Sequence, residues 1–284
     1  MKDSLVNGHV VDVDLLKLYT FYSVGHTEGE KAICDYLQQW FTDNGTTVER
    51  YGNTLIHMVD ESLPLLSAHL DMVDTNGPAV HFYGNDGIIT GYNEYYQQTS
   101  LGADDKNGVW IIMKAVEAGL EFNFVISECE ECGGDGIHKV EDKLIGSYAV
   151  VMDRKGNTDI LEKGCSTQYC KTLAWNLKNF WDNGYTVTTG GMSDTQTICK
   201  HIESVNISVA YNNPHTENEE TDFDRLDEIK DDVIRMLTDF VHYPCKPEDY
   251  TTVYNYTKKE KKYDDNYWKK LYSYEDDETY WPLR

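Results

Sequence analysis

The sequence predicts an α/β fold, a three-layer α/β/α sandwich built around a mixed, mainly parallel sheet. Short and almost wholly apolar runs recur along the chain, with the length and composition of buried strands. Segments with apolar residues at three- and four-residue spacing separate these runs, as amphipathic helices would. Strands that alternate with helices and lack a polar face are typical of a parallel sheet covered on both sides.

The predicted elements follow one another along the first five-sixths of the chain. Five runs are predicted as strands: residues 54–59, 64–68, 122–127, 147–152 and 205–210. Three segments are predicted as helices: residues 27–44, 105–118 and 222–242. Gly45 is placed to end the first helix, and Thr221 or Asp222 is placed to cap the last one. The turn-rich stretch over residues 76–99 is expected to be a hairpin or loop.

Length and composition indicate one large domain with an appendage. At 284 residues the chain can build one sizeable α/β core. We expect this single domain to span residues 1–243 and to be followed, over residues 244–284, by a tyrosine-rich and charged extension. Two interpretations of the extension stay open: a poorly ordered tail, or a segment that docks on the domain or on another subunit and so supports an oligomer.

Charge and cysteine content exclude several function classes. The formal charge is −24, from 25 basic and 49 acidic residues, and such a surface repels nucleic acid. No stretch approaches the roughly 18 apolar residues of a membrane span, and no signal peptide is evident. The seven cysteines are odd in number and scattered, which favours reduced thiols. We therefore expect a cytoplasmic protein without a nucleic-acid or membrane partner.

Acidic and histidine side chains follow the predicted strands at the ends where α/β sheets gather their function. Taken singly, each has an ordinary explanation: a surface polar pair, a solvated glutamate face or a helix cap. Their coincidence at one edge of a sheet is much less probable and favours a site. The residues concerned are His69, Asp71, Asp104, Glu130, Glu131, Asp153 and His215.

These residue types suit a centre of two zinc ions. Such a centre needs nitrogen and oxygen ligands, one carboxylate that bridges the metals, and a carboxylate that is no ligand and takes a proton from water. Adjacent glutamates allow this division of roles. The spacing of His69 and Asp71 puts both side chains on one side of an extended segment, so that Asp71 can hold the imidazole from behind.

Six motifs in order carry a resemblance to a known family: SAHLDMVD, LGADDKNG, ECEECGG, VMDRKGN, GGMSD and NNPHTENE. Together they resemble the zinc-dependent exopeptidase superfamily, at its end with peptidase T and the lidless aminopeptidases. The resemblance covers roughly residues 12–242. It implies two Zn²⁺ ions, for which Co²⁺ or Mn²⁺ could substitute.

The resemblance assigns a role to each motif residue. It implies that His69 and His215 bind different zinc ions, that Asp104 bridges both, and that a cis peptide follows Asp104. Glu131 and Asp153 are implied as ligands to one zinc each. Catalytic roles fall to Glu130, as the general base, and to Asp71, which orients His69.

Two intervals depart from larger members of the superfamily. The stretch between Asp153 and His215 is too short for a lid domain, and that between His69 and Asp104 is too short for an inserted β-domain. We therefore expect one catalytic domain without a lid insertion. The predicted reaction is release of N-terminal residues from short peptides by a metallopeptidase of the aminopeptidase type. Alternatives are deacylation of N-acyl amino acids, or a non-catalytic binding or scaffold protein.

Other motifs remain open. Cys129 and Cys132 form a Cys-x-x-Cys, for which two small buried thiols beside the site are favoured over structural zinc or a redox pair. The glycine-rich stretch over residues 190–194 is either a turn before a helix or a substrate contact. Arg154 and Lys155 could contact substrate, although solvated charges are an equal alternative.

Overall fold

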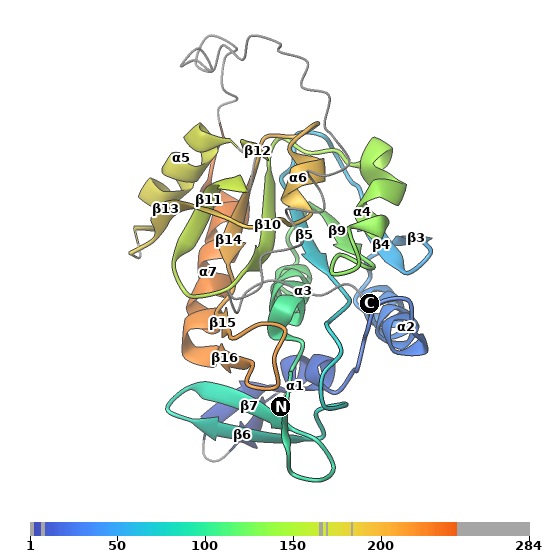
Figure 1. Ribbon diagram of the computed structural model, residues 1–284. Helices are drawn as coiled ribbons and strands as arrows, with labels where there is room; N and C mark the ends of the chain where they lie inside the picture. The colour runs from blue at the N-terminus through green and yellow to red at the C-terminus, as the bar shows by residue number, and fades with distance from the viewer. Residues whose placement is uncertain (1–2, 7–8, 165–166, 169, 183, 243–284) are drawn as a thin grey trace, which may run out of the picture. The chain divides into compact units, whose positions relative to one another are not determined.

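A computed structural model describes residues 3–6, 9–164, 167–168, 170–182 and 184–242. The predicted extension over residues 244–284 lies outside the described residues. Three sheets, one of them a two-stranded pair near the N-terminus, and seven α-helices organise the described part of the chain (Figure 1). None of the described helices combines the length and the apolarity that crossing a membrane requires.

The main sheet is mixed, with a parallel centre. Its four central strands lie side by side and all run in the same direction: β14 (Ser204–Ser208), β10 (Ala149–Arg154), β5 (Leu65–His69) and β9 (Asn123–Ser127). Antiparallel pairs and one more parallel pair, β11 with β13, extend it on both sides through β3 (Glu49–Tyr51), β4 (Thr54–His57), β11 (Asp159–Gly164), β12 (Thr167–Gln168) and β13 (Thr186–Gly190). The predicted mixed, mainly parallel sheet is confirmed.

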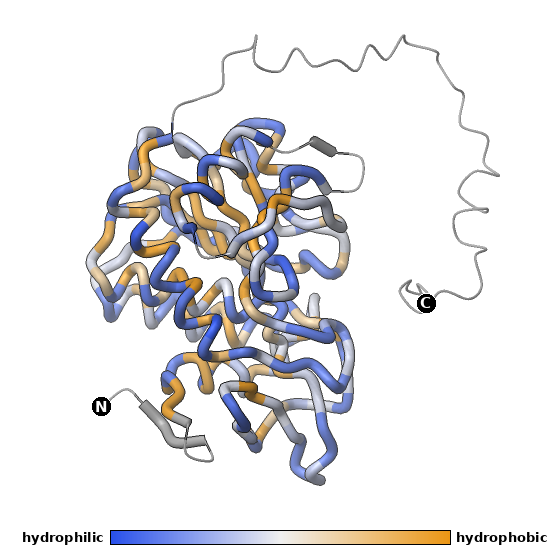
Figure 2. Tube along the Cα trace, turned by 90° about the vertical axis from the view of Figure 1, so that its left-hand side faces the viewer, coloured by the Kyte–Doolittle hydropathy of each residue, from blue (hydrophilic) through white to orange (hydrophobic). Residues whose placement is uncertain are grey.

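Helices cover both faces of this sheet. On one face α4 (Asp135–Val140) and α6 (Thr195–Ile198) pack on Leu65, Val125 and Val151 in a buried apolar cluster. Four longer helices cover the other face: α2 (Glu28–Asp43), α3 (Ala103–Glu117), α5 (Lys171–Trp181) and α7 (Phe223–Asp239). Phe41 of α2, for example, stacks on Phe124 of β9 with ring centroids 4.8 Å apart. Apolar segments accordingly concentrate in the interior strands (Figure 2).

All five predicted strands and all three predicted helices occur, with ends shifted by a few residues. Asp222, rather than Thr221, caps α7, because its side chain accepts a hydrogen bond from the Arg225 amide at 3.1 Å. Short elements that carry little periodicity were not predicted: β1 (Asp3–Val6), β2 (His9–Asp12), α1 (Val13–Tyr19), β3, α4, the short helix Glu141–Lys143, β11 to β13 and α6. Helix α5 was also missed, although its buried residues Leu173, Leu177 and Trp181 recur at helical spacing. The described residues between 155 and 210 complete the main sheet, and no lid domain is inserted among them.

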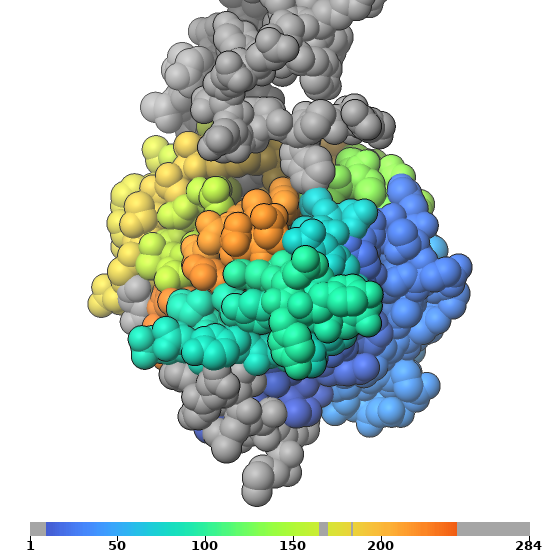
Figure 3. Space-filling view, turned by 60° about the horizontal axis from the view of Figure 1, so that its bottom comes forward, coloured from blue at the N-terminus to red at the C-terminus, as the bar shows by residue number. Residues whose placement is uncertain are grey.

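A second, antiparallel sheet was not predicted as such. The stretch over residues 76–99 forms the expected hairpin, β6 (His81–Asn85) and β7 (Ile88–Tyr92), followed by β8 (Gln98–Thr99). Strand β7 also pairs with β16 (Glu220–Asp222), which pairs with β15 (Tyr211–Asn212). Figure 3 shows the hairpin in teal beside the orange segment near residue 215. This sheet therefore anchors both ends of the loop that carries His215.

Gly108 sets the spacing between α3 and the main sheet. A Cβ atom at this position would lie 2.6 Å from the Met152 carbonyl oxygen of β10 and 2.6 Å from Asp105 Oδ1. Real Cβ atoms do not approach backbone so closely, so α3 can sit this near β10 only with glycine here.

Replacing Gly108 with alanine is therefore expected to destabilise the fold. Gly108→Ala should lower the free energy of unfolding by about 1–3 kcal/mol, the usual cost of overpacking, despite the higher helix propensity of alanine. Urea unfolding of the metal-free protein measures this change in the free energy of unfolding. Gly191→Ala is the matched control, because no atom lies within 4 Å of a Cβ placed there. An unchanged Gly108→Ala midpoint would contradict the packing account.

Candidate metal centre

The structure brings all five predicted ligands to one edge of the main sheet. His69 is the last residue of β5, and Asp153 is the penultimate residue of β10. Glu131 lies in the turn after β9, and Asp104 is the second residue of α3. His215 comes from the loop between β15 and β16. Parallel strands that end at a common edge explain why these distant residues converge.

Asp104 lies between the two histidines. Its Oδ1 is 3.3 Å from His69 Nε2, while its Oδ2 is 3.1 Å from His215 Nε2. Asp153 Oδ1 is 3.8 Å from the same His69 nitrogen, and Glu131 Oε1 is 2.6 Å from the His215 nitrogen. Two groups of three possible ligands therefore meet and have Asp104 in common.

The residues present fit divalent cations. His69 Nε2 and Asp104 Oδ1 are buried and, among the described residues, have no hydrogen-bond partner of acceptable geometry, although they face each other. A buried polar atom without a partner is costly, and a cation between the two would satisfy both. Imidazole nitrogen with carboxylate oxygen is a ligand set that zinc accepts.

Crowded buried acids make the centre electrostatically unstable without positive charge. Burial and the nearby negative charges of Glu130 and Asp104 raise the pKa of Asp153 well above its ordinary value. Burial alone would lower the pKa of His215, but hydrogen bonds to Asp104 and Glu131 raise it to about 10. The pKa of His69 is likewise raised by Asp104 and Asp71 against the effect of burial. Without cations, the raised pKa values of Asp153, His69 and His215 favour protons on these groups, where metal ions would otherwise supply the positive charge.

Glu219 holds the backbone at Asp104, a role that sequence reasoning missed. Its Oε2 accepts hydrogen bonds from Ser100 Oγ at 2.6 Å and the Ala103 amide at 3.0 Å, and its Oε1 accepts one from the Asp104 amide at 3.2 Å. Asp104 has non-helical φ and ψ, and the peptide bond to Asp105 is cis, as the resemblance implied. Glu219 lies within the acidic run after His215, but nothing in that run marks it as buried.

Asp71 links His69 to the turn with the two glutamates. Its carboxylate Oδ1 is 3.4 Å from His69 Nδ1, while its backbone carbonyl lies closer, at 3.1 Å. The two carboxylate oxygens also accept hydrogen bonds from the amides of Glu130, at 2.8 Å, and Glu131, at 3.1 Å. Asp71 thus contacts the imidazole, as predicted, and in addition fixes the position of both glutamates.

Glu130 lies beside the metal ligands. One of its carboxylate oxygens lies within 4.8 Å of ligand atoms of His69 and Glu131. Burial and the negative charges of Glu131, Asp194 and Asp104 raise its pKa well above the ordinary value, although His69 opposes the shift. A carboxylate with a raised pKa takes up a proton readily.

Asn206 supports Asp153 from the neighbouring strand and was also not predicted. Its side chain accepts a hydrogen bond from the Asp153 amide at 3.1 Å and donates one to the Asp153 carbonyl at 2.9 Å. Arg154 binds Asp159 with two nitrogens, at 3.0 and 3.1 Å, so its charge is engaged away from the ligands.

Two of the open motifs take a definite place. In the glycine-rich stretch, Asp194 directly precedes α6, and one of its carboxylate oxygens binds the Ser127 hydroxyl at the end of β9. The prediction of two buried thiols in the Cys-x-x-Cys is confirmed for Cys129, which is buried, and wrong for Cys132, which is exposed. The turn at residues 129–134 brings Cys132 to the surface.

Comparisons with known proteins agree on the fold. No protein-family model matches the sequence, and no curated protein matches it. Among solved structures, the aminopeptidase PepT from Bacillus cereus superposes with a TM-score of 0.66 at 17% identity, over 79% of this chain and 96% of PepT. A Zn-dependent exopeptidase from Parabacteroides distasonis gives a TM-score of 0.60 at 16% identity, over 79% and 95%. The fold of this chain is therefore similar to the folds of these two solved structures.

A third similar structure is the TET1 peptidase of Pyrococcus horikoshii, with a TM-score of 0.60 at 15% identity, over 79% of this chain and 98% of that one. TET1 can assemble into a tetrahedron or a large octahedral shell. The expected resemblance is thus confirmed for the fold.

Cation binding should release protons. Without a cation His215 is protonated at neutral pH, because its pKa is raised to about 10, and His69 shifts in the same direction. A metal ligand must be an unprotonated imidazole, so zinc affinity is expected to rise as the pH increases from 6 to 8. Titration calorimetry with Zn²⁺ in two buffers of different ionisation enthalpy measures the released protons.

The matched variant is His215→Asn, since His215 has a φ of 63° and asparagine tolerates this left-handed backbone. It should bind fewer ions and release fewer protons. Binding with no proton release in the unaltered protein would contradict the account.

Proposed function

We propose that this protein is a two-zinc metallopeptidase that releases N-terminal residues from short peptides. The observation that carries the proposal is the placement of Asp104, whose two carboxylate oxygens face His69 and His215 respectively. One ion would be held by His69, Asp104 and Asp153, and the other by Asp104, Glu131 and His215. The similar structures, among them an aminopeptidase and a Zn-dependent exopeptidase, support the reaction class.

Zinc ions at these positions would polarise the scissile carbonyl and lower the pKa of water between them. Glu130 would accept a proton from this water as its oxygen bonds to the carbonyl carbon. The same side chain would then deliver the proton to the departing amine as the carbon–nitrogen bond breaks. Asp71 would keep Glu130 in place, because its carboxylate accepts a hydrogen bond of 2.8 Å from the backbone amide of Glu130.

The charge of the site favours a substrate with a free amino group. Asp104, Glu130, Glu131 and Asp153 supply four carboxylates, and two divalent ions would only balance them. The chain as a whole carries a formal charge of −24. A positively charged N-terminus is therefore attracted, whereas an N-acylated substrate lacks this attraction.

Assembly and location are separate parts of the proposal. The large assemblies that TET1 can form support association between copies of the present chain. The predicted role of the extension over residues 244–284 in such contacts, and the predicted cytoplasmic location, stay predictions.

Replacing the proposed base should separate chemistry from metal binding. Glu130→Gln is expected to retain the zinc content of the unaltered protein and to lose turnover by about 10²–10⁴-fold, the usual worth of general base catalysis. The assay is digestion of a mixed pool of short peptides, followed by mass spectrometry, with parallel metal analysis. Glu61→Gln, at an exposed turn, is the matched control. Undiminished turnover in Glu130→Gln would remove Glu130 from the mechanism.

The same pool with acetylated N-termini tests the substrate class. Loss of single residues from free N-termini alone supports an aminopeptidase, and a chelator should stop it. Cleavage of N-acyl amino acids without peptide cleavage would instead support the deacylase alternative. A protein that binds no metal and cleaves neither class would be a scaffold that retains the fold.

A further inference from the structure

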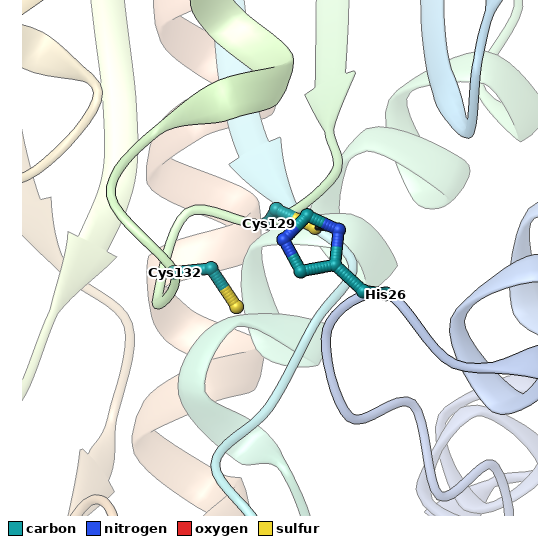
Figure 4. A group of neighbouring side chains, drawn as sticks. All are labelled: His26, Cys129 and Cys132. Carbon is teal, nitrogen blue, oxygen red and sulfur yellow. Dashed lines mark hydrogen bonds between the residues drawn. The ribbon is translucent and has the colours of Figure 1, made fainter. Parts of the chain in front are cut away.

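A second group of possible ligands lies next to the proposed base but shares no residue with the metal centre. It consists of His26, in the loop before α2, together with Cys129 and Cys132. One ligand atom from each lies within 4.8 Å of the others, and Figure 4 shows the ring and both thiols converging. The two cysteines flank Glu130 and Glu131 in the sequence.

The turn after β9 brings the two thiols together. The Gly133 amide donates to the Glu130 carbonyl at 2.9 Å, and the Gly134 amide donates to the Cys129 carbonyl at 2.9 Å. These bonds reverse the chain so that Cys132 returns toward Cys129. A tight turn within a Cys-x-x-Cys is the arrangement by which such pairs present two sulfurs to one metal ion.

His26 is oriented as a metal-binding histidine would be. Its Nδ1 is 3.1 Å from Cys129 Sγ, while its Nε2 faces the Asp135 carboxylate at 3.9 Å. One ring nitrogen toward the ligand group and the other toward a carboxylate is the usual environment of a metal-bound imidazole. The backbone amide of His26 donates to Glu30 Oε2 at 3.2 Å, which holds the loop in position.

Two buried carboxylates lie close to the thiols and favour the binding of a cation there. Glu30 is fully buried and its Oε1 accepts a hydrogen bond from the Cys129 amide at 2.8 Å. The buried carboxylate of Asp71 is also near the thiols. A Cβ atom placed on Gly25 would lie 2.5 Å from Cys132 Sγ and 3.3 Å from Asp71 Oδ2. Negative charge around two thiols attracts a divalent ion, which can displace their protons.

We propose that His26, Cys129 and Cys132 form a further metal site, selective for a soft divalent cation such as Zn²⁺. Bond lengths of about 2.3 Å to sulfur and about 2.0–2.1 Å to nitrogen require ligand atoms roughly 3.6–3.8 Å apart in tetrahedral geometry. Small rotations of the exposed His26 and Cys132 side chains bring the three atoms from within 4.8 Å to this spacing. The fourth position is open to water. This site does not depend on the proposed peptidase activity.

Co²⁺ distinguishes this site from the metal centre beside it. Thiolate ligands give Co²⁺ an intense charge-transfer absorption in the near ultraviolet, and no ligand proposed for the two-metal centre contains sulfur. The reduced full-length protein titrated with Co²⁺ is expected to develop this band. Cys132→Ser should abolish it, and Cys199→Ser, at the partly exposed end of α6, should leave it intact.

A variant that keeps every ligand provides the second test. The Cβ atom of Gly25→Ala would lie 2.5 Å from Cys132 Sγ and 3.6 Å from Cys129 Sγ, so it would fill the space between the thiols. We expect it to weaken the band although all three proposed ligands are still present. Absence of the band from the reduced unaltered protein, its survival in Cys132→Ser, or a Cys129–Cys132 disulfide that forms in its place in the presence of the metal would overturn the proposal.

Discussion

The attraction between Asp104 and two histidines that are far apart in the sequence is the interaction around which the site is built. His69 arrives from the centre of the main sheet, and His215 arrives from a loop that the second sheet anchors. Burial raises the pKa of Asp104, but the His215 and His69 imidazoles on either side of the carboxylate lower it below its ordinary value. A single carboxylate thus joins two parts of the fold that have no strand in common.

Much of the surrounding structure keeps this carboxylate in place. Gly108 allows α3 to approach β10 closely. Glu219 accepts hydrogen bonds from the backbone amides of Ala103 and Asp104. Glu219 itself is fully buried, and its pKa is raised by burial and by the negative charge of Asp104. Burying so many acids costs free energy that protein hydrogen bonds only partly offset. Cations at the centre would supply the remaining compensation, which connects metal binding to the stability of the fold.

Five strands of the main sheet, three of the four longer helices and the candidate ligands could be predicted, because each leaves a local signal in the sequence. A buried strand is a short apolar run, and a residue such as His69 directly follows one. Supporting residues leave no such signal. Glu219 and Asn206 act through hydrogen bonds to backbone that is distant in sequence. An acidic side chain in a loop, such as Glu219, is usually solvated, and a single amide within an apolar strand, such as Asn206 in β14, does not indicate which backbone it contacts. His26 joins Cys129 across about a hundred residues, a proximity that only the folded chain creates.

The central claim is that two ions share Asp104. Anomalous diffraction from crystals of the zinc-loaded protein, measured on both sides of the zinc absorption edge, tests it most directly. The account predicts two peaks on either side of the Asp104 carboxylate, one toward His69 and Asp153 and one toward His215 and Glu131. No peak beside Asp104, or a single peak that leaves one of the two histidines without metal, would contradict it.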